Sequence, residues 1–433
     1  MKPEIINIQI TTVAFSLFFL LLSWVEVKRL KSVITPFVVA AIPFIIILLL
    51  VNFVLIDFQF PPVTMRSQLF IASCLFLVWL SGFVVSGLFK NISPSKNKIF
   101  FKFAEEFNRF DMVLIIIAWI IAFIILHKAI VLFKQHGGFA YFGNQEYENE
   151  MIVGVVAHLV QLGKVVFIFL IFIFNKSKHK FLMFVTLFLL GIAIASIQVK
   201  YHIMFVIFIA FLFYNIGKPV KNQIKILAIS ALALFLIMNI FWFTLTIAWG
   251  TFGFSKAGVW EFFFKQTLNY FVTGPMVLDT WLSHPAIKPD WTLLVVVLNF
   301  YYFITGSLVR ISAVPLVNMY FQQTAPGLYS NVGTAYGVYY LIGGLPLTFA
   351  MVIMVSILSY VFYFKSIRSY SPYLIFLNLL FLTMGVLSFF VQYFTLLSTY
   401  EAIVLFFALV IFFRLIIYLN DLIKKTKSEL RLE

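Results

Sequence analysis

The sequence predicts an all-α polytopic membrane protein with about eleven transmembrane helices, within a range of ten to twelve. Apolar residues make up 63% of the chain, charged residues make up 11%, and the mean hydropathy is +1.05. Soluble domains are about 45–50% apolar and about 25% charged, so a water-soluble protein is excluded. Apolar segments of membrane-crossing length recur along the chain, and basic residues gather between alternate segments.

Eleven segments have the length and composition of membrane spans, since a helix needs about 20 apolar residues to cross the hydrocarbon core. They are 5–25, 36–56, 69–89, 112–132, 152–174, 181–197, 199–216, 226–248, 336–364, 372–390 and 401–419. The first is long enough to span and be retained, and it lacks the form of a cleaved signal peptide.

The basic residues predict the orientation. The formal net charge is +15, from 31 Lys and Arg against 16 Asp and Glu. If the loop after the first span is cytoplasmic and the sides alternate, 20 of the 31 basic residues fall in cytoplasmic loops and the tail. This pattern puts the N-terminus outside and the C-terminus in the cytoplasm. Most of the positive charge is then a topology signal, and nucleic acid is not expected as a partner.

A further apolar run at 291–309 is expected to be re-entrant or interfacial, because a single crossing there would put Lys365, Arg368 and the basic tail outside. Segment 249–335 is therefore one long outer loop, and loops of this length usually have a function. The predicted organisation is a bundle of eight helices over 1–248, the outer loop over 249–335, and three helices with a basic tail over 336–433.

Two ionisable residues lie where the membrane is predicted to be. Residues 181–216 must cross out and return, but 36 helical residues reach only about 54 Å, less than two crossings of about 30 Å. The turn with Lys200 and His202 is thus expected in the outer third of the membrane, where an ionisable residue indicates a functional site. The alternative is a lysine that snorkels to the headgroups. For His158 and Lys164, pairing within the bundle and a chemical role are both open.

The span at 336–364 is long and contains Gly343, Gly344 and Pro346 near its outer end. Either a packing kink or a discontinuous helix lining a cavity would produce this pattern. No metal or cofactor site is predicted, because the six His are scattered and the single cysteine, Cys74, sits in an apolar run. No nucleotide-binding fingerprint is present either.

Two stretches carry a family resemblance. YFVTGPMVLDTWL (270–282) and YSNVGTAYGVYYLIGG (329–344) resemble the Wzy-type polymerases of O-antigen and capsule oligosaccharide repeat units. The matching residues are Tyr270, Gly274, Pro275, Asn331, Thr334, Tyr339, Tyr340 and Gly344. Ile342 stands where the family has an acid, and Lys200 stands where it often has an arginine.

The resemblance implies a GT-C-like glycosyltransferase in a bacterial cytoplasmic membrane, with its active site toward the periplasm. Such an enzyme moves a growing chain from undecaprenyl pyrophosphate onto the next lipid-linked oligosaccharide, and its partners would include a flippase and a chain-length regulator. Lys200 and Arg310 would stabilise pyrophosphate charge, and His284 or Asp279 would act as the base. His202, Lys265, Tyr270, Gly274, Pro275, Asn331, Thr334, Tyr339 and Tyr340 are expected to bind substrate.

Three alternatives stay open. An O-antigen ligase of the same clan would have a histidine motif in this loop, whereas Ser330 precedes Asn331 here. A flippase or secondary transporter would often show paired halves with matched broken helices. Here the break and the long loop both lie in the second half of the chain. A non-enzymatic scaffold would not explain a lysine at a submerged turn.

Overall fold

A computed structural model describes residues 3–89, 98–136, 145–229, 258–283, 322–369 and 371–429, except for 152, 198–199, 331, 391 and 395, together with a few isolated positions between 230 and 305. The chain forms two compact units, each built from segments that are distant in the sequence. Unit 1 comprises 1–96, 214–368 and 378–397. Unit 2 comprises 97–213, 369–377 and 398–433.

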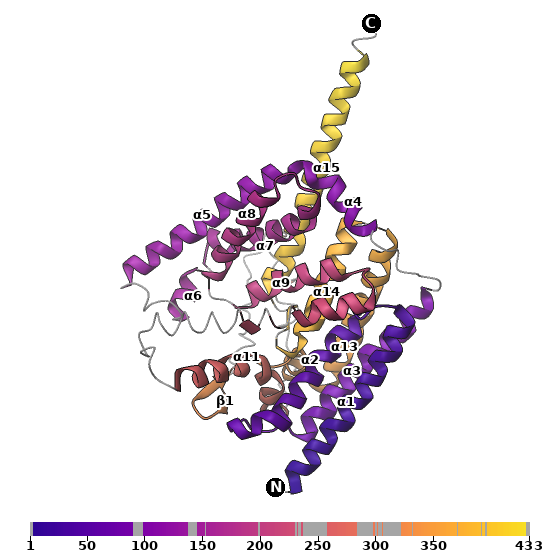
Figure 1. Ribbon diagram of the computed structural model, residues 1–433, viewed down its shortest axis with the longest axis vertical. Helices are drawn as coiled ribbons and strands as arrows, with labels where there is room; N and C mark the ends of the chain where they lie inside the picture. The colour runs from indigo at the N-terminus through magenta and orange to yellow at the C-terminus, as the bar shows by residue number, and fades with distance from the viewer. Residues whose placement is uncertain are drawn as a thin grey trace. The chain divides into compact units, whose positions relative to one another are not determined.

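The helices of unit 1 are α1 (Pro3–Leu30), α2 (Pro36–Leu49), α3 (Met65–Leu88), α11 (Gly258–Ser283) and α13 (Ala335–Ser369). Helices α1, α2 and α3 lie side by side (Figure 1). Thr35 caps α2 by accepting the Val38 N–H, and the proline at the first helical position needs no such partner. Helix α2 continues through the π-helical Leu50–Val54 into the 3-10 turn Leu55–Phe58.

The helices of unit 2 are α4 (Lys98–Phe107), α5 (Asp111–Gln135), α6 (Gln145–Met151), α7 (Val155–Ile173), α8 (Lys180–Ala195), α9 (Lys200–Asn215) and α15 (Leu397–Glu429). Phenylalanine rings fill its core: Phe169 and Phe406 lie 4.9 Å apart, and Phe172 stacks on Phe213 at 3.9 Å. Helix α14 (Pro372–Val386) contributes residues to both units.

The all-α membrane architecture predicted from the sequence is confirmed. Eight described helices are long and apolar enough to cross a membrane, and two shorter apolar helices, Lys180–Ala195 and His202–Asn215, form the pair predicted at 181–216. These ten coincide with ten of the predicted spans. The remaining span, 226–248, lies mostly outside the described residues. Helices α8 and α9 have 16 residues each, about 24 Å of helix, which agrees with a short hairpin.

Helix α13 is broken where the sequence suggested. Gly343 has φ −154° and ψ 21°, and Gly344 has φ 66° and ψ −164°, a conformation that is essentially restricted to glycine. The Thr348 hydroxyl donates to the Gly344 carbonyl at 2.8 Å, so this carbonyl at the break has a hydrogen-bond partner. Two non-helical glycines fit both a packing kink and a discontinuous helix, so both interpretations of this span stay open.

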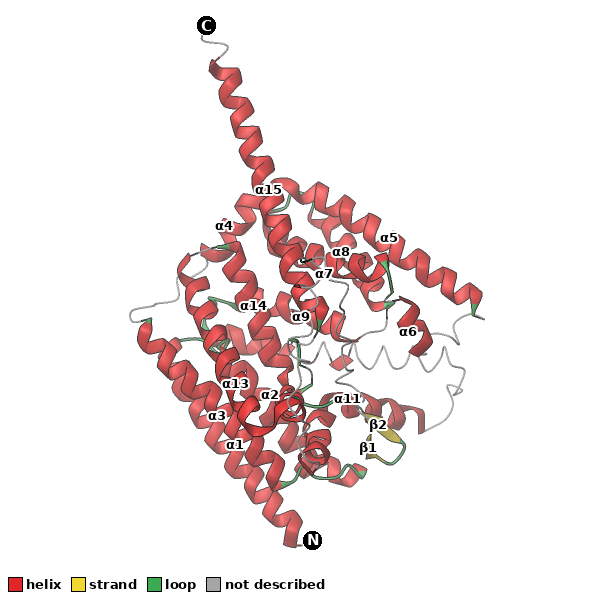
Figure 2. Ribbon diagram, turned by 180° about the vertical axis from the view of Figure 1, so that it is seen from behind, coloured by secondary structure: helices red, strands yellow, loops and turns green. Residues whose placement is uncertain are grey.

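The predicted outer loop contains more regular structure than expected. Residues 258–283 form the helix α11, and Gln322–Ala325 (β1) pairs antiparallel with Leu328–Ser330 (β2) beside it (Figure 2). Gly327, at φ +73°, makes the turn of this hairpin. Of the run 291–309, only Leu298, Tyr301 and Thr305 belong to the described residues.

Candidate functional site

Polar side chains hold the β1–β2 hairpin onto α11. The Asn269 amide donates to the Tyr329 carbonyl at 3.2 Å and accepts from the Thr324 hydroxyl at 2.5 Å. One turn along α11, the Thr273 and Ser330 hydroxyls are 3.1 Å apart. These pairs fix the hairpin just before the chain enters α13, so the two motif stretches lie together.

Residues 387–394 of unit 1 pack against both motif stretches. A Cβ at Gly274 would lie 1.8 Å from the Phe389 carbonyl oxygen and 3.6 Å from Thr334, so the glycine permits this close approach. The Tyr270 ring lies 4.5 Å from that of Phe390. The Gln392 amide donates to the Tyr339 hydroxyl at 3.2 Å. The structure thus brings Tyr270, Gly274, Thr334 and Tyr339 into one neighbourhood.

The beginning of α13 is capped and covered by α11. The Thr334 hydroxyl accepts the Gly337 N–H at 2.9 Å, and its carbonyl accepts the Val338 N–H. The Trp281 ring covers Gly333 and Gly337, where a Cβ would come within 2.0 Å and 2.8 Å of the ring. Thr334, expected to contact substrate, is therefore buried in this structure and holds the start of a helix.

A cavity of about 70 Å³ lies next to this junction in unit 1. Its lining combines apolar residues with hydroxyl and amide groups: Tyr336, Tyr339, Ser356, Ser359, Ser388, Gln392 and Tyr393. A space of this size has room for several water molecules but is small for a sugar ring, and its walls are mostly apolar. Tyr270 and Tyr340 are not in its lining, and Tyr340 instead meets Phe70 of α3 edge-on at 5.7 Å.

Asp279 connects α11 to the start of α3. Its carboxylate accepts the Thr64 N–H at 2.8 Å, the Thr64 hydroxyl at 2.5 Å and the Ser67 hydroxyl. A carboxylate at a helix N-terminus stabilises the helix through the free N–H groups and the dipole. Because its oxygens are already engaged by three donors, Asp279 acts here as a cap rather than as an available base.

A second polar cluster lies in unit 2, where the chain has a buried lysine. The Lys164 Nζ of α7 lies 3.0 Å from the His202 Nδ1 of α9. Only 2% of Lys164 and 3% of His202 are exposed. The Phe205 ring is 5.2 Å from the ammonium, a cation–π distance. At 3.0 Å the two nitrogens share one proton, since two protons between them would repel. Of the two roles left open for Lys164, pairing within the bundle is observed.

The same cluster extends to the surface through an acid. The His158 Nδ1 lies 2.7 Å from a Glu401 carboxylate oxygen, and Glu401 is close enough to act electrostatically on Lys164. His158 is 68% exposed and Glu401 20%. His158, His202 and Glu401 lie near the N-terminal ends of α7, α9 and α15, and Lys164 lies at the middle of α7.

The remaining expected site residues lie apart or outside the described residues. Lys200 is the first residue of α9, two positions before His202. Lys265 is half-buried on α11, and Pro275 is buried in the same helix. Arg310, His284 and Asn331 are outside the described residues, so their expected roles stay predictions.

Sequence reasoning missed Glu401 and Gln392. Glu401 stands near the start of a predicted span, where a single acid looks like part of a membrane boundary. Gln392 follows a span with no polar pattern around it. An acid within the first two turns of a long apolar helix was the one available signal for Glu401.

Comparison with known proteins gives a family without an assigned role. The profile of a family of unknown function, DUF6337, matches residues 54–418. The chain belongs to the DUF6337 family. No curated protein and no solved structure matches it significantly. The matched range contains all the residues of both polar clusters, so both clusters lie within the region that the family model describes.

Proposed function

We propose that this protein is a membrane glycosyltransferase that polymerises lipid-linked oligosaccharide repeat units. The growing chain would leave undecaprenyl pyrophosphate and join the non-reducing end of the next lipid-linked unit. A bond forms between the anomeric carbon and the acceptor hydroxyl oxygen, and the bond to the pyrophosphate oxygen breaks. The hydroxyl proton passes to a base, and undecaprenyl pyrophosphate is the leaving group.

The observation that carries this proposal is the Lys164–His202 pair with Glu401 and His158. Burying a lysine among apolar helices is costly, and ionisable residues at such places usually serve function. A cation here would oppose the charge that grows on the departing pyrophosphate. With Lys164 charged, the His202 Nδ1 lone pair accepts one of its protons, so His202 would orient the cation and another group would take the hydroxyl proton. Lys200, two residues from His202, would add a second cation.

Within unit 1, the junction of α11, the hairpin and α13 would bind part of the oligosaccharide. Its motif residues fit tightly: Gly274 admits the Phe389 carbonyl, and Trp281 covers Gly333. Half-buried Tyr270 and Tyr340 and the Gln392–Tyr339 pair supply the aromatic and polar groups that sugars need. Under this proposal Gly274, Pro275 and Thr334 shape the site, and the tyrosines contact the sugar.

The proposed setting is a bacterial cytoplasmic membrane, with the N-terminal ends of α7, α9 and α15 toward the periplasm. This orientation follows from the basic residues of the loops. Undecaprenyl-pyrophosphate oligosaccharide would be the substrate, and a flippase and chain-length regulator would be partners.

One observation favours a second candidate, a transporter of the lipid-linked unit. Helix α13 is interrupted at Gly343 and Gly344, and discontinuous helices form the substrate sites of many transporters. A transporter would move the unit across the bilayer without lengthening it, so a single assay separates the two functions.

The test is polymerisation in proteoliposomes that contain the purified full chain. The substrate is undecaprenyl-pyrophosphate oligosaccharide isolated from the source organism after deletion of this gene. We expect a ladder of products from the wild type and none from Lys164→Met, which removes the charge at similar side-chain length. Lys180→Met, at an exposed lysine of the neighbouring helix α8, is the matched control and should retain the ladder. An unchanged ladder from Lys164→Met, or none from the wild type, would overturn the proposal.

A further inference from the structure

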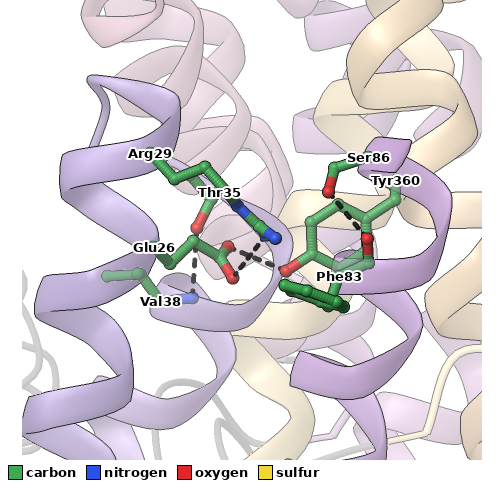
Figure 3. A network of polar contacts seen from close by, with 7 residues as sticks. All are labelled: Glu26, Arg29, Thr35, Val38, Phe83, Ser86 and Tyr360. Atoms are coloured by element: carbon green, nitrogen blue, oxygen red, sulfur yellow. Dashed lines mark hydrogen bonds and ion pairs between the residues drawn. The ribbon is translucent and has the colours of Figure 1, made fainter. Parts of the chain in front are cut away.

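Glu26 is a fully buried carboxyl within a membrane-spanning helix. It lies on α1, in the candidate span Glu4–Leu30, and has no exposed surface. The Tyr360 hydroxyl of α13 donates to Glu26 Oε1 at 2.7 Å (Figure 3). The Thr35 side chain is close enough to interact with the same carboxyl. These partners come from α13 and from the start of α2, so two other parts of the chain meet the carboxyl in the interior.

The charge of Glu26 is only partly compensated. Its Oε2 lies 3.7 Å from the Arg29 Nη2, which is an ion pair but too long for a hydrogen bond. Glu26 Oε2 and the Arg29 Nε and Nη2 have no hydrogen-bond partner within the described part of the chain. The guanidinium lies 5.4 Å from the Phe83 ring of α3 (Figure 3). A buried carboxylate usually requires good hydrogen bonds to every lone pair, and this one lacks them.

The other ionisable groups around Glu26 do not complete that compensation. On α13, Tyr363 is hydrogen-bonded to Ser32 and lies near enough to interact with Glu26. On α1, Lys28 lies over the Trp24 ring at 3.8 Å, and Lys31, just after the helix, is exposed. The parts of α2 and α3 that meet the cluster present Thr35, Phe83 and Ser86, none of which carries a charge (Figure 3).

The position of Tyr360 is enforced by its neighbours. A Cβ at Gly82 of α3 would lie 2.1 Å from the Tyr360 ring, so only glycine admits the ring there. The cavity of unit 1 is lined by Pro36 and Ser359, the sequence neighbours of Thr35 and Tyr360, and not by Glu26 itself.

We propose that Glu26 is a proton-binding site inside the membrane-spanning part of unit 1. The ligand is a proton, which binds to Glu26 Oε2, the oxygen that faces Arg29 without a hydrogen bond. In the charged state Glu26 pairs with Arg29 and accepts from Tyr360. In the neutral state the ion pair is lost, the Tyr360 contact weakens, and α1 and α13 are held together less firmly. The site is independent of the polymerase proposal, since its residues belong to unit 1 and its test uses no sugar substrate.

The experiment is infrared difference spectroscopy of the full chain in lipid nanodiscs, titrated with pH. We expect the wild type, compared with Glu26→Gln, to show one additional carbonyl band of a neutral carboxylic acid that grows as pH falls, beyond the bands of the other fifteen Asp and Glu residues. Glu4→Gln, at an exposed carboxyl of the same helix, is the matched control and should keep the band. Tyr360→Phe removes a donor that favours the charged form, so the midpoint should move to higher pH.

The result is decisive in each direction. Carbonyl bands that are the same in Glu26→Gln and the wild type at every pH where both stay folded would overturn the proposal. A midpoint that does not rise in Tyr360→Phe would also count against it. Because Glu26→Gln keeps the shape of the side chain, a second readout guards against misfolding: a hydrophobic carbodiimide, which reacts with protonated carboxyls in apolar surroundings, should modify Glu26 in the wild type and more at low pH. Its absence from the Glu26 peptide would also refute the site.

Discussion

Lys164 and His202 lie 3.0 Å apart between helices α7 and α9, and both side chains are almost completely buried. Two basic residues at this distance function as one unit with a shared proton. The two residues are 38 positions apart in the sequence, so their contact joins two different helices. Any change to one partner therefore alters the state of the other.

Glu401 is expected to influence the Lys164–His202 pair without being essential for polymerisation. Glu401→Gln keeps the side chain's shape but removes the charge that favours a protonated Lys164. Because Glu401 and its partner His158 are partly exposed, their pair is worth at most about 1 kcal/mol. Polymerisation should fall by less than about tenfold, against complete loss in Lys164→Met. Complete loss in Glu401→Gln would show that the acid is itself indispensable.

Gly274→Ala should destabilise unit 1. The new Cβ would lie 1.8 Å from the Phe389 carbonyl, so α11 must shift, at a cost of about 1–3 kcal/mol or more. Gly87→Ala is the matched control, because this glycine lies in α3 with no atom within 4 Å of the added Cβ. The thermal midpoint of the detergent-solubilised protein measures both. Equal midpoints for the two variants would contradict the close packing.

Asp279→Asn should loosen the start of α3. The asparagine amide cannot accept all three donors now directed at the carboxylate, and hydrogen bonds to a charged group are worth about 1.5–3 kcal/mol. Hydrogen exchange at the first turn of α3 should become faster. Ser283→Ala, an exposed change whose hydroxyl donates to the Asp279 carbonyl, should leave that exchange unaltered.

The topology can be tested with single cysteines, because the native Cys74 is completely buried and should give little background. Glu146→Cys should react with a membrane-impermeant maleimide from outside intact cells. Lys178→Cys, equally exposed but on the predicted cytoplasmic side, should react only after permeabilisation. Labelling in the opposite order would reverse the orientation and place the Lys164 cluster at the cytoplasmic face.

Much of the fold could be predicted from the sequence, because the length and hydropathy of a segment determine whether it can span a membrane. The break in α13 was also readable, since Gly343, Gly344 and Pro346 leave few other conformations. The sequence predicted a submerged His202 from hairpin length alone, and the structure places it against Lys164.

The partners of the buried polar groups could not be predicted, because the two members of each pair lie far apart in the sequence. Glu26 and Tyr360 are separated by 334 residues, and neither stands in a local pattern that names the other. Asp279 was one of the candidate bases because it is an acid of the long outer loop, whereas its contacts in the structure are with Thr64 and Ser67, more than 200 residues earlier. Local sequence specifies helices well but says little about which helix each polar group will meet.

The separation of Glu26 from Tyr360 also has a meaning in time. At about 5–20 residues per second, a ribosome needs between roughly 15 and 70 seconds to make the chain between them. During that interval α1 must remain in the membrane without its tyrosine donor. Arg29, three residues on in the same helix, is available as soon as α1 emerges. The ion pair with Arg29 can therefore partly compensate the charge of Glu26 until Tyr360 has been synthesised.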